Sequence, residues 1–185
     1  MAKIAENVSG QSYQNLVSEL FKKCKMERTI VPDASNQQDV IAGYAETTEG
    51  NFDKVKGLLD GVVIPAGGVA STAGDVLLWN ENLHHGKLLS NSSYQSMTTI
   101  STRRNHSVMG DVGVGYGLLI DDKGKIREMG HTGYILEQGF TSINMYYPSS
   151  DTSLIILENQ AFDYKDFDRA FFFEKEIRKF LKENL

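Results

Sequence analysis

The chain has 185 residues, of which 41% are apolar and 23% charged, as expected for a globular protein with its own core. Its net charge of −5 argues against a general nucleic-acid binder. The single cysteine, Cys24, excludes an intrachain disulfide. No apolar run approaches the roughly 20 residues needed to cross a bilayer, so we expect no membrane span.

The first residues predict two helices. Residues 3–8 have a helical pattern, and Gly10 suits a left-handed C-terminal cap. Ser12 is placed to cap a second helix with one apolar face. The pattern starts at the second residue without an entry signal, and no signal peptide is recognisable, which is consistent with a start added to a fragment. Residues 27–65 predict mostly loop with short extended pieces.

Helical spacing returns after residue 65. Thr72 and Asp75 resemble a capping box at the start of a helix that ends at Gly86. A short helix follows, with Ser90 or Asn91 as its cap.

The second half changes to the period of strands. Residues 113–122, 125–131, 140–148 and 152–159 predict an antiparallel meander of about four strands, and residues 166–185 predict an amphipathic closing helix. The fold class is therefore α+β, in one domain over residues 1–185. Residues 1–110 are mostly helices and loops, and residues 111–185 form the strands and closing helix. The expected core contains Trp79, Leu83, Phe140, Ile155, Ile156, Phe173, Ile177 and Leu181.

Several familiar functional motifs are excluded by the sequence around them. The glycines of "GDVGVGYG" precede a strand, whereas a nucleotide-binding loop follows one and opens a helix. The four histidines, His84, His85, His106 and His131, lack zinc-ligand spacing, so we predict no metal and no cofactor. Cys24 at a helix end is more typical of a structural residue than of a nucleophile.

The segment "EMGHTGYILEQG" places His131 and Thr132 between glycines beside a predicted strand. Glycine weakens a strand unless a bulge, a bend or a close backbone approach requires it. The segment is therefore either an ordinary turn or a strand edge left bare for a ligand.

Several segments together resemble the serine β-lactamase and penicillin-binding-protein family. They are "IAGY" (41–44), "PAGGVASTAGDV" (65–76), "GYGLLI" (115–120), "GHTG" (130–133) and "LIILEN" (154–159), in the order and spacing of that family. Within it, the chain is similar to the branch of class C enzymes, D-amino-acid peptidases and related esterases. The resemblance covers nearly the whole chain and implies a β-lactamase/transpeptidase-like fold.

The resemblance also implies roles for the strand residues. The family attacks an amide or ester with a serine that a lysine activates in an S-x-x-K motif, and backbone N–H groups hold the oxyanion. The main-chain N–H of Tyr134 would be one such donor, and Thr132 would offer its hydroxyl. His131 would replace the usual lysine beside the substrate carboxylate or the catalytic tyrosine, while Gly130 and Gly133 would keep the edge bare.

The nucleophile motif is missing from the chain. No serine has lysine three positions later, and Ser18 comes nearest, with Lys22 at four. Tyr13-Gln14-Asn15 spells the family's tyrosine motif but follows "VSGQS", whereas the family places the tyrosine before that helix. We therefore expect the C-terminal part of the family domain, without the first two strands and the nucleophile helix.

Two functions remain open at this stage. The first is the C-terminal part of a serine hydrolase acting on a peptide, β-lactam or ester, inactive as this chain alone. The second is a truncated relative that binds a ligand or self-associates. A neutral imidazole at His131 attracts a carboxylate less than an ammonium does, which favours substrates other than β-lactams. Localisation stays open, although the family is often extracytoplasmic.

The absence of the first strand predicts self-association. In the family that strand pairs with the last one, which here spans Thr152 to Asn159. Its unpaired edge is apolar, without lysine or proline, and such an edge can pair with another chain. We therefore expect a homo-oligomer through Leu154–Leu157.

Overall fold

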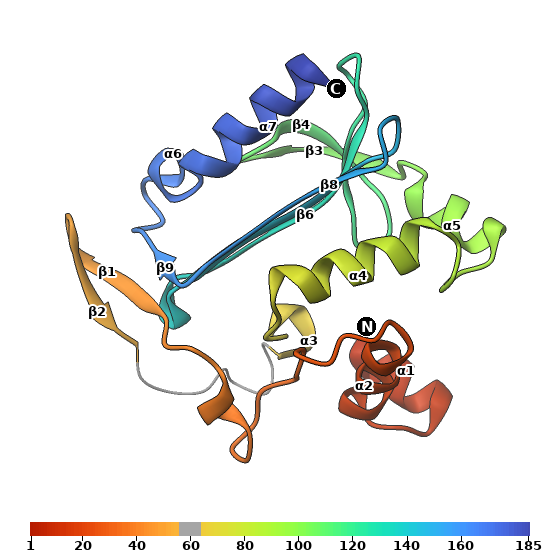
Figure 1. The fold of residues 1–185 in the computed structure, drawn as a ribbon, viewed down its shortest axis with the longest axis horizontal. Helices are drawn as coiled ribbons and strands as arrows, with labels where there is room; N and C mark the ends of the chain where they lie inside the picture. The colour runs from red at the N-terminus through yellow and green to blue at the C-terminus, as the bar shows by residue number, and fades with distance from the viewer. Residues whose placement is uncertain (56–63) are drawn as a thin grey trace.

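The computed structural model describes residues 1–55 and 64–185, and a six-stranded antiparallel sheet dominates it (Figure 1). Its strand order is the chain order: β3 (Thr102–His106), β4 (Gly110–Val114), β5 (Leu119–Asp121), β6 (Glu128–Ile135), β7 (Phe140–Tyr147) and β8 (Thr152–Glu158). A small sheet, in the order β2-β1-β9, contains β1 (Tyr44–Thr48), β2 (Asn51–Lys54) and β9 (Gln160–Ala161).

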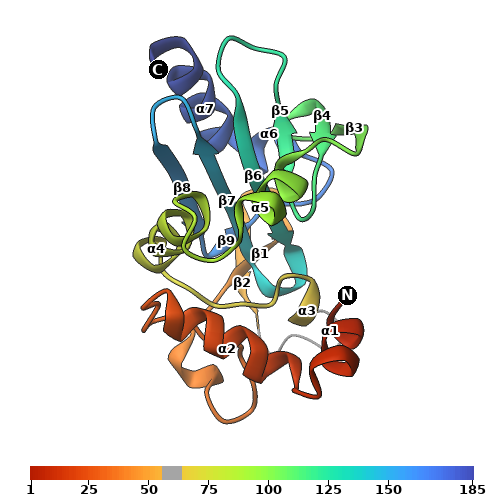
Figure 2. The ribbon, with the colours of Figure 1, turned by 90° about the vertical axis from the view of Figure 1, so that its right-hand side faces the viewer.

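Helices cover both faces of the large sheet. The helices are α1 (Ala2–Ser9), α2 (Tyr13–Lys23), α3 (Ile64–Gly67), α4 (Ala73–His84), α5 (Asn91–Thr98), α6 (Phe167–Ala170) and α7 (Phe172–Asn184), with short 3-10 turns η1 (Gln37–Asp39) and η2 (Leu136–Gln138). The sheet is seen almost edge-on in Figure 1, with α7 on one face and α4 on the other. Figure 2 shows the α1–α2 pair below α4, away from the strands.

The predicted helix ends are confirmed. Gly10 has a φ of 71° and caps α1 in the left-handed conformation. The Ser12 hydroxyl accepts the N–H of Asn15 at 3.2 Å, and the Ser90 hydroxyl accepts that of Ser93 at the same distance. These signals lie within three residues of the helix they start, so neighbouring structure is not needed to read them.

The predicted capping box is only half formed. The Thr72 hydroxyl accepts the N–H of Asp75 at 3.2 Å, as expected. The Asp75 carboxylate, however, accepts the N–H of Arg28 at 2.8 Å and the hydroxyl of Thr29 at 2.6 Å. Asp75 therefore ties the segment after α2 to the start of α4 instead of closing its own helix turn.

The strand predictions agree with β7 and β8, whereas the predicted strand 125–131 overlaps only the first half of β6, which continues to Ile135. Residues 102–106 add the strand β3, and the predicted strand 113–122 is divided between β4 and β5 by a bend at Gly117, whose φ is 72°. The loop predicted for residues 27–65 contains the β1–β2 hairpin, and its residues 56–63 lie outside the described part.

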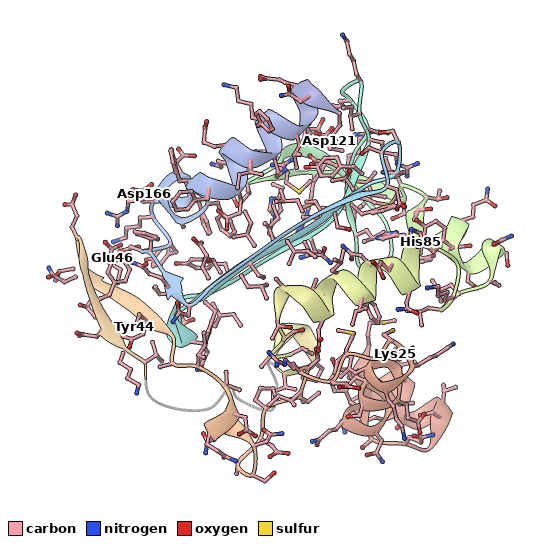
Figure 3. The ribbon with its side chains drawn as sticks, in the orientation of Figure 1. Lys25, Tyr44, Glu46, His85, Asp121 and Asp166 are labelled. Carbon is pink, nitrogen blue, oxygen red and sulfur yellow. The ribbon has the colours of Figure 1, made fainter. Side chains whose placement is uncertain are left out.

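A buried glutamate joins the small sheet to α6. Glu46 of β1 accepts the backbone N–H groups of Gly50 at 2.8 Å and Asp163 at 2.9 Å, and its carboxylate pairs with the Arg169 guanidinium. Figure 3 shows Glu46 on the side of β1 that faces the Asp166 turn. Backbone and charged donors together compensate this carboxylate for its loss of water.

The closing helix forms where predicted, but the face expected to be buried was wrong. Phe173 is 59% exposed and Ile177 is 38% exposed, whereas Phe171, Glu174 and Arg178 are buried. The reason is electrostatic. Glu128 of β6 lies fully buried beneath the helix, and Arg178 pairs with it. An unpaired carboxylate there would cost several kcal/mol, about the cost of leaving these two side chains in water.

The observed core lies between β7 and α7. The buried cluster comprises Val108, Met109, Val112, Leu119, Ile143, Met145, Tyr147, Leu154, Ala170 and Phe171. Of the expected core residues, Leu83 is buried. Trp79, Phe140, Ile155, Ile156 and Leu181 are partly buried. The alternation of Ile143, Met145 and Tyr147 along β7 sends one face of the strand towards α7.

Glu174 is buried in the same interface without compensation. Neither of its carboxylate oxygens has a hydrogen-bond partner among the described residues. Burial, and then the nearby Glu158 carboxylate, raise its pKa from 4.5 to about 7. The folded state therefore binds a proton that the unfolded state has released between those two pH values. The stability from this proton is complete below pH 4.5 and is lost as the pH rises to 7.

We predict that Glu174→Gln removes this loss. The free energy of unfolding of the variant, relative to the unmodified chain, should increase by up to about 1.4 kcal/mol per pH unit between pH 5 and 7. Urea unfolding at several pH values measures it. Glu176→Gln, at an exposed position of the same helix, is the control and should give a constant difference. Parallel pH profiles for all three proteins would contradict the prediction.

Candidate active site

The site is built on β6, one of whose edges is only partly covered. β6 pairs with β7 from Met129 to Ile135, but it pairs with β5 only from Glu128 to Gly130. From His131 to Ile135 the edge facing away from β7 has no strand partner in the described part of the chain. The sequence predicts a bare edge here; His131 is exposed, whereas Thr132 and Gly133 are half-buried.

The two glycines of the motif serve different purposes. A methyl group on Gly130 would overlap the backbone carbonyl of Asn144 on β7, so this position requires a close backbone approach. A methyl group on Gly133 would meet only the Ser142 hydroxyl, which can rotate. The face of Gly133 is thus occupied by Ser142, contrary to the expectation of little side-chain cover there.

The side chains of the motif point in different directions. His131 is exposed, and its Nδ1 lies 2.6 Å from the backbone oxygen of Thr132. Thr132 is half-buried. The ring of Tyr134 lies 5.2 Å from that of Phe167, and its hydroxyl donates to the backbone oxygen of Phe162. Burial raises the pKa of Tyr134 to about 12. Its side chain therefore packs inside the fold, against Phe167 and the segment that carries Phe162.

One further residue reaches the motif and was missed in the sequence. His106, at the end of β3, places Nε2 3.4 Å from Oγ1 of Thr132. The sequence indicated only that it lacked zinc-ligand spacing. No local signal could have found the contact, because 26 residues separate the two positions and the curl of the β3–β4 hairpin brings them together.

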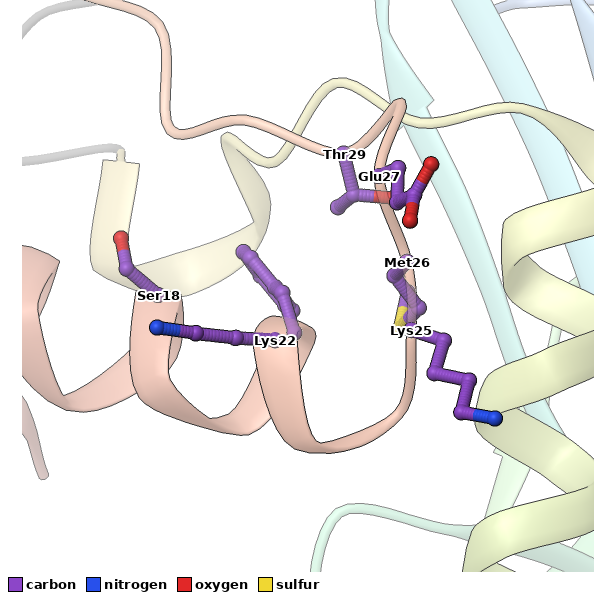
Figure 4. A pocket seen from close by; sticks show the side chains of 7 residues that line it. Ser18, Lys22, Lys25, Met26, Glu27 and Thr29 are labelled. Carbon is purple, nitrogen blue, oxygen red and sulfur yellow. The ribbon is translucent and has the colours of Figure 1, made fainter.

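Ser18 and Lys22 do not form a nucleophile pair. Both line a cavity of about 270 Å³ at the end of α2, together with Phe21, Lys25, Met26, Glu27 and Thr29. Figure 4 shows Lys25 pointing away from Ser18 and Lys22. No hydrogen bond joins these two side chains, although both are described. In Figure 1, α4 lies between α2 and the large sheet, and none of the residues that line the cavity belongs to β6.

Two general searches give negative findings for the described residues. In residues 1–55 and 64–185, no group of three His, Cys, Asp or Glu side chains is arranged to hold a metal ion. No helix in that part of the chain has the length and apolar character needed to span a bilayer.

The beta-lactamase family model matches residues 1–179. The chain belongs to the beta-lactamase family. The resemblance seen in the sequence and the predicted α+β, β-lactamase/transpeptidase-like fold are thereby confirmed. No curated protein matches the sequence.

Solved structures of the beta-lactamase fold are similar to the chain. The octameric penicillin-binding protein homologue from Pyrococcus abyssi has a TM-score of 0.75 and 24% identity, over 86% of this chain and 36% of its own. The D-amino acid amidase from Ochrobactrum anthropi SV3 has a TM-score of 0.71 and 21% identity, over 87% of this chain and 47% of its own. A class C beta-lactamase has a TM-score of 0.67 and 14% identity, over 91% of this chain and 52% of its own.

These similarities support the fold. At identities of 14% to 24%, they do not carry over a substrate. The chain spans between 36% and 52% of the length of these three structures.

The two glycines should differ in their tolerance of a side chain. We predict that Gly130→Ala destabilises the protein by about 2–3 kcal/mol, because the backbones of β6 and β7 must separate. Gly133→Ala should cost less, and adding Ser142→Ala should restore its stability. Thermal and urea unfolding measure both. Equal losses for the two single variants would contradict this account of the strand pair.

Proposed function

We propose that the chain supplies the oxyanion strand and substrate wall of a serine hydrolase that acts on a peptide, β-lactam or ester. Tyr134 provides a backbone N–H to the oxyanion, and Thr132 provides a hydroxyl to the substrate. His131 stands beside the substrate carboxylate or the catalytic tyrosine, and Gly133 lies next to Thr132 in the substrate-binding stretch.

The observation that carries this proposal is the unpaired edge of β6 in a chain of the beta-lactamase family. An oxyanion donor must point at the substrate from a fixed backbone, and a strand held on one side only offers such donors. β7 pairs with β6 from Met129 to Ile135, whereas the pairing with β5 ends at Gly130 and leaves the next five residues without a strand partner on that edge among the described residues. His131 is exposed at the start of this open stretch.

We further propose that the chain is inactive by itself. Acyl transfer in this family needs an activated serine, and no S-x-x-K motif occurs in the 185 residues. The substrate class follows from the relatives only in outline. Their names include D-amino acid amidases, penicillin-binding proteins and a class C beta-lactamase, and His131 in place of lysine favours an amide or ester over a β-lactam.

The test compares two forms of the protein. The chain alone should not react with a fluorescent penicillin or hydrolyse a D-amino-acid amide or a simple ester. The chain extended by the residues encoded upstream, if they include S-x-x-K, should react. In the extended form His131→Ala and Thr132→Val should lower kcat/KM by tenfold or more. Labelling of a serine in the chain alone, or unchanged kinetics in both variants, would refute the proposal.

A second function, self-association, is favoured by the free edge of β8. β8 is the last strand of the large sheet and pairs only with β7 among the described residues. Next to it, α7 exposes Phe173, Ile177 and Phe180. Arg178 and Lys182 reach β6 and β5 from one flank of α7, so this aromatic stripe lies on the flank nearer β8.

A two-fold symmetric dimer would cover both the free edge of β8 and the exposed apolar residues of α7. Antiparallel pairing of two β8 strands about an axis perpendicular to the sheet leaves both α7 helices on the same face. The exposed apolar residues of the two α7 helices would then face each other across the axis. The penicillin-binding protein homologue from Pyrococcus abyssi is itself octameric, although its interfaces are not evidence for this one.

We predict that the unmodified chain is a dimer at high concentration in light scattering. Leu157→Lys on the exposed side of β8 and Phe180→Glu on α7 should each produce monomers, because a charge on an edge strand or an aromatic stripe opposes pairing. Leu185→Lys, an exposed apolar position at the chain end, is the control. A monomeric unmodified chain would exclude the two-fold interface.

A further inference from the structure

His106 lies at the end of β3 with one ring nitrogen against the active-site strand. Its Nε2 is 3.4 Å from the Thr132 hydroxyl oxygen, and both side chains are half-buried. This is the contact through which the β3–β4 hairpin reaches the motif side chains of β6. The distance is long for a hydrogen bond but within reach of one.

The other ring nitrogen determines where the hydrogen is. Nδ1 of His106 accepts the backbone N–H groups of Val108 at 3.2 Å and Met109 at 3.4 Å. A backbone N–H can only donate, so Nδ1 must be unprotonated. A neutral imidazole then carries its hydrogen on Nε2. The Nε2–H group faces Thr132 and must donate to its oxygen.

The surroundings keep this ring neutral. Burial lowers the pKa of His106 from its ordinary 6.5, and the positive charges of Arg104 and Arg178 lower it further. Arg178 of α7 also donates to the backbone oxygen of Val108 at 3.4 Å. The turn that carries His106 is therefore hydrogen-bonded to α7. No carboxylate is among the groups that change the pKa of His106.

We propose that His106 is a positioning residue for Thr132. By donating Nε2–H to the hydroxyl oxygen, it turns the hydroxyl hydrogen of Thr132 away from the ring and leaves it free to donate to a substrate carboxylate or carbonyl. A hydroxyl that accepts one hydrogen bond is also a better donor in the next. The role at the substrate rests on the function proposed above, whereas the tautomer and the contact do not.

A purely local role would involve Nδ1 alone. A side chain that accepts backbone N–H groups two and three residues later is a turn cap, and asparagine can do the same with its amide oxygen. His106→Asn should therefore preserve the β3–β4 turn while its shorter side chain fails to reach Thr132. This variant separates the positioning role from the structural one.

The test is imidazole ¹⁵N NMR on the chain alone. We expect His106 as the Nε2–H tautomer, with an Nε2–H proton slow enough in exchange to be observed. Thr132→Val should abolish that proton signal and shift Nε2, whereas Thr132→Ser should retain it. Thr102→Val, on the same strand β3, is the control and should change nothing. An Nδ1–H tautomer, or an Nε2 signal indifferent to Thr132→Val, would overturn the proposal.

The extended, reactive form supplies the second readout. His106→Asn should raise KM for substrate about tenfold with kcat nearly unchanged, and it should add nothing to Thr132→Val. Additive effects would contradict the coupling. If the extended form shows no hydrolysis, the proposed function fails while the NMR result still decides the His106 contact. A wrong tautomer refutes the contact and leaves the proposed function standing.

Discussion

The ion pair between Arg178 and Glu128 is the constraint on which the rest of the structure depends. Glu128 is fully buried in β6, and Arg178 covers it from α7, with Lys182 2.7 Å from the same carboxylate. Arg178 also donates to the backbone of Val108, and the turn there holds the ring of His106. One guanidinium therefore sets the rotation of α7, fixes the β3–β4 turn and indirectly orders the surroundings of Thr132. Removing it would leave a buried charge, which is far costlier than losing an exposed pair.

The same rotation of α7 explains which of its apolar side chains are exposed to solvent. With Arg178 directed at the sheet, the stripe of Phe173, Ile177 and Phe180 turns outwards beside the open edge of β8. Glu174 is carried inwards as a consequence, and burial raises its pKa to about 7. The helix thus combines a paired buried charge, a buried carboxyl group without a hydrogen-bond partner among the described residues and an exposed apolar surface. Only the first of these stabilises the isolated chain at neutral pH.

The candidate site depends on unequal strand lengths. β6 continues five residues beyond its pairing with β5, while β7 supports it throughout. The close approach at Gly130 keeps these two strands in register. The result is a rigid strand with one free edge, which is the arrangement that a backbone oxyanion donor needs. The chain belongs to the beta-lactamase family, and it spans between 36% and 52% of the length of the solved structures compared with it.

The sequence by itself determined the features whose causes are local. Gly10, Ser12 and Ser90 could be predicted as caps because each acts within a few residues, and the order of the motifs around His131 identified the family and the α+β fold. Only the tertiary structure decided which face of α7 is buried, why Asp75 leaves its capping box and how His106 meets Thr132. Each of these depends on a polar partner 26 to 50 residues away in the chain. Hydrophobic periodicity carries no information about such a partner.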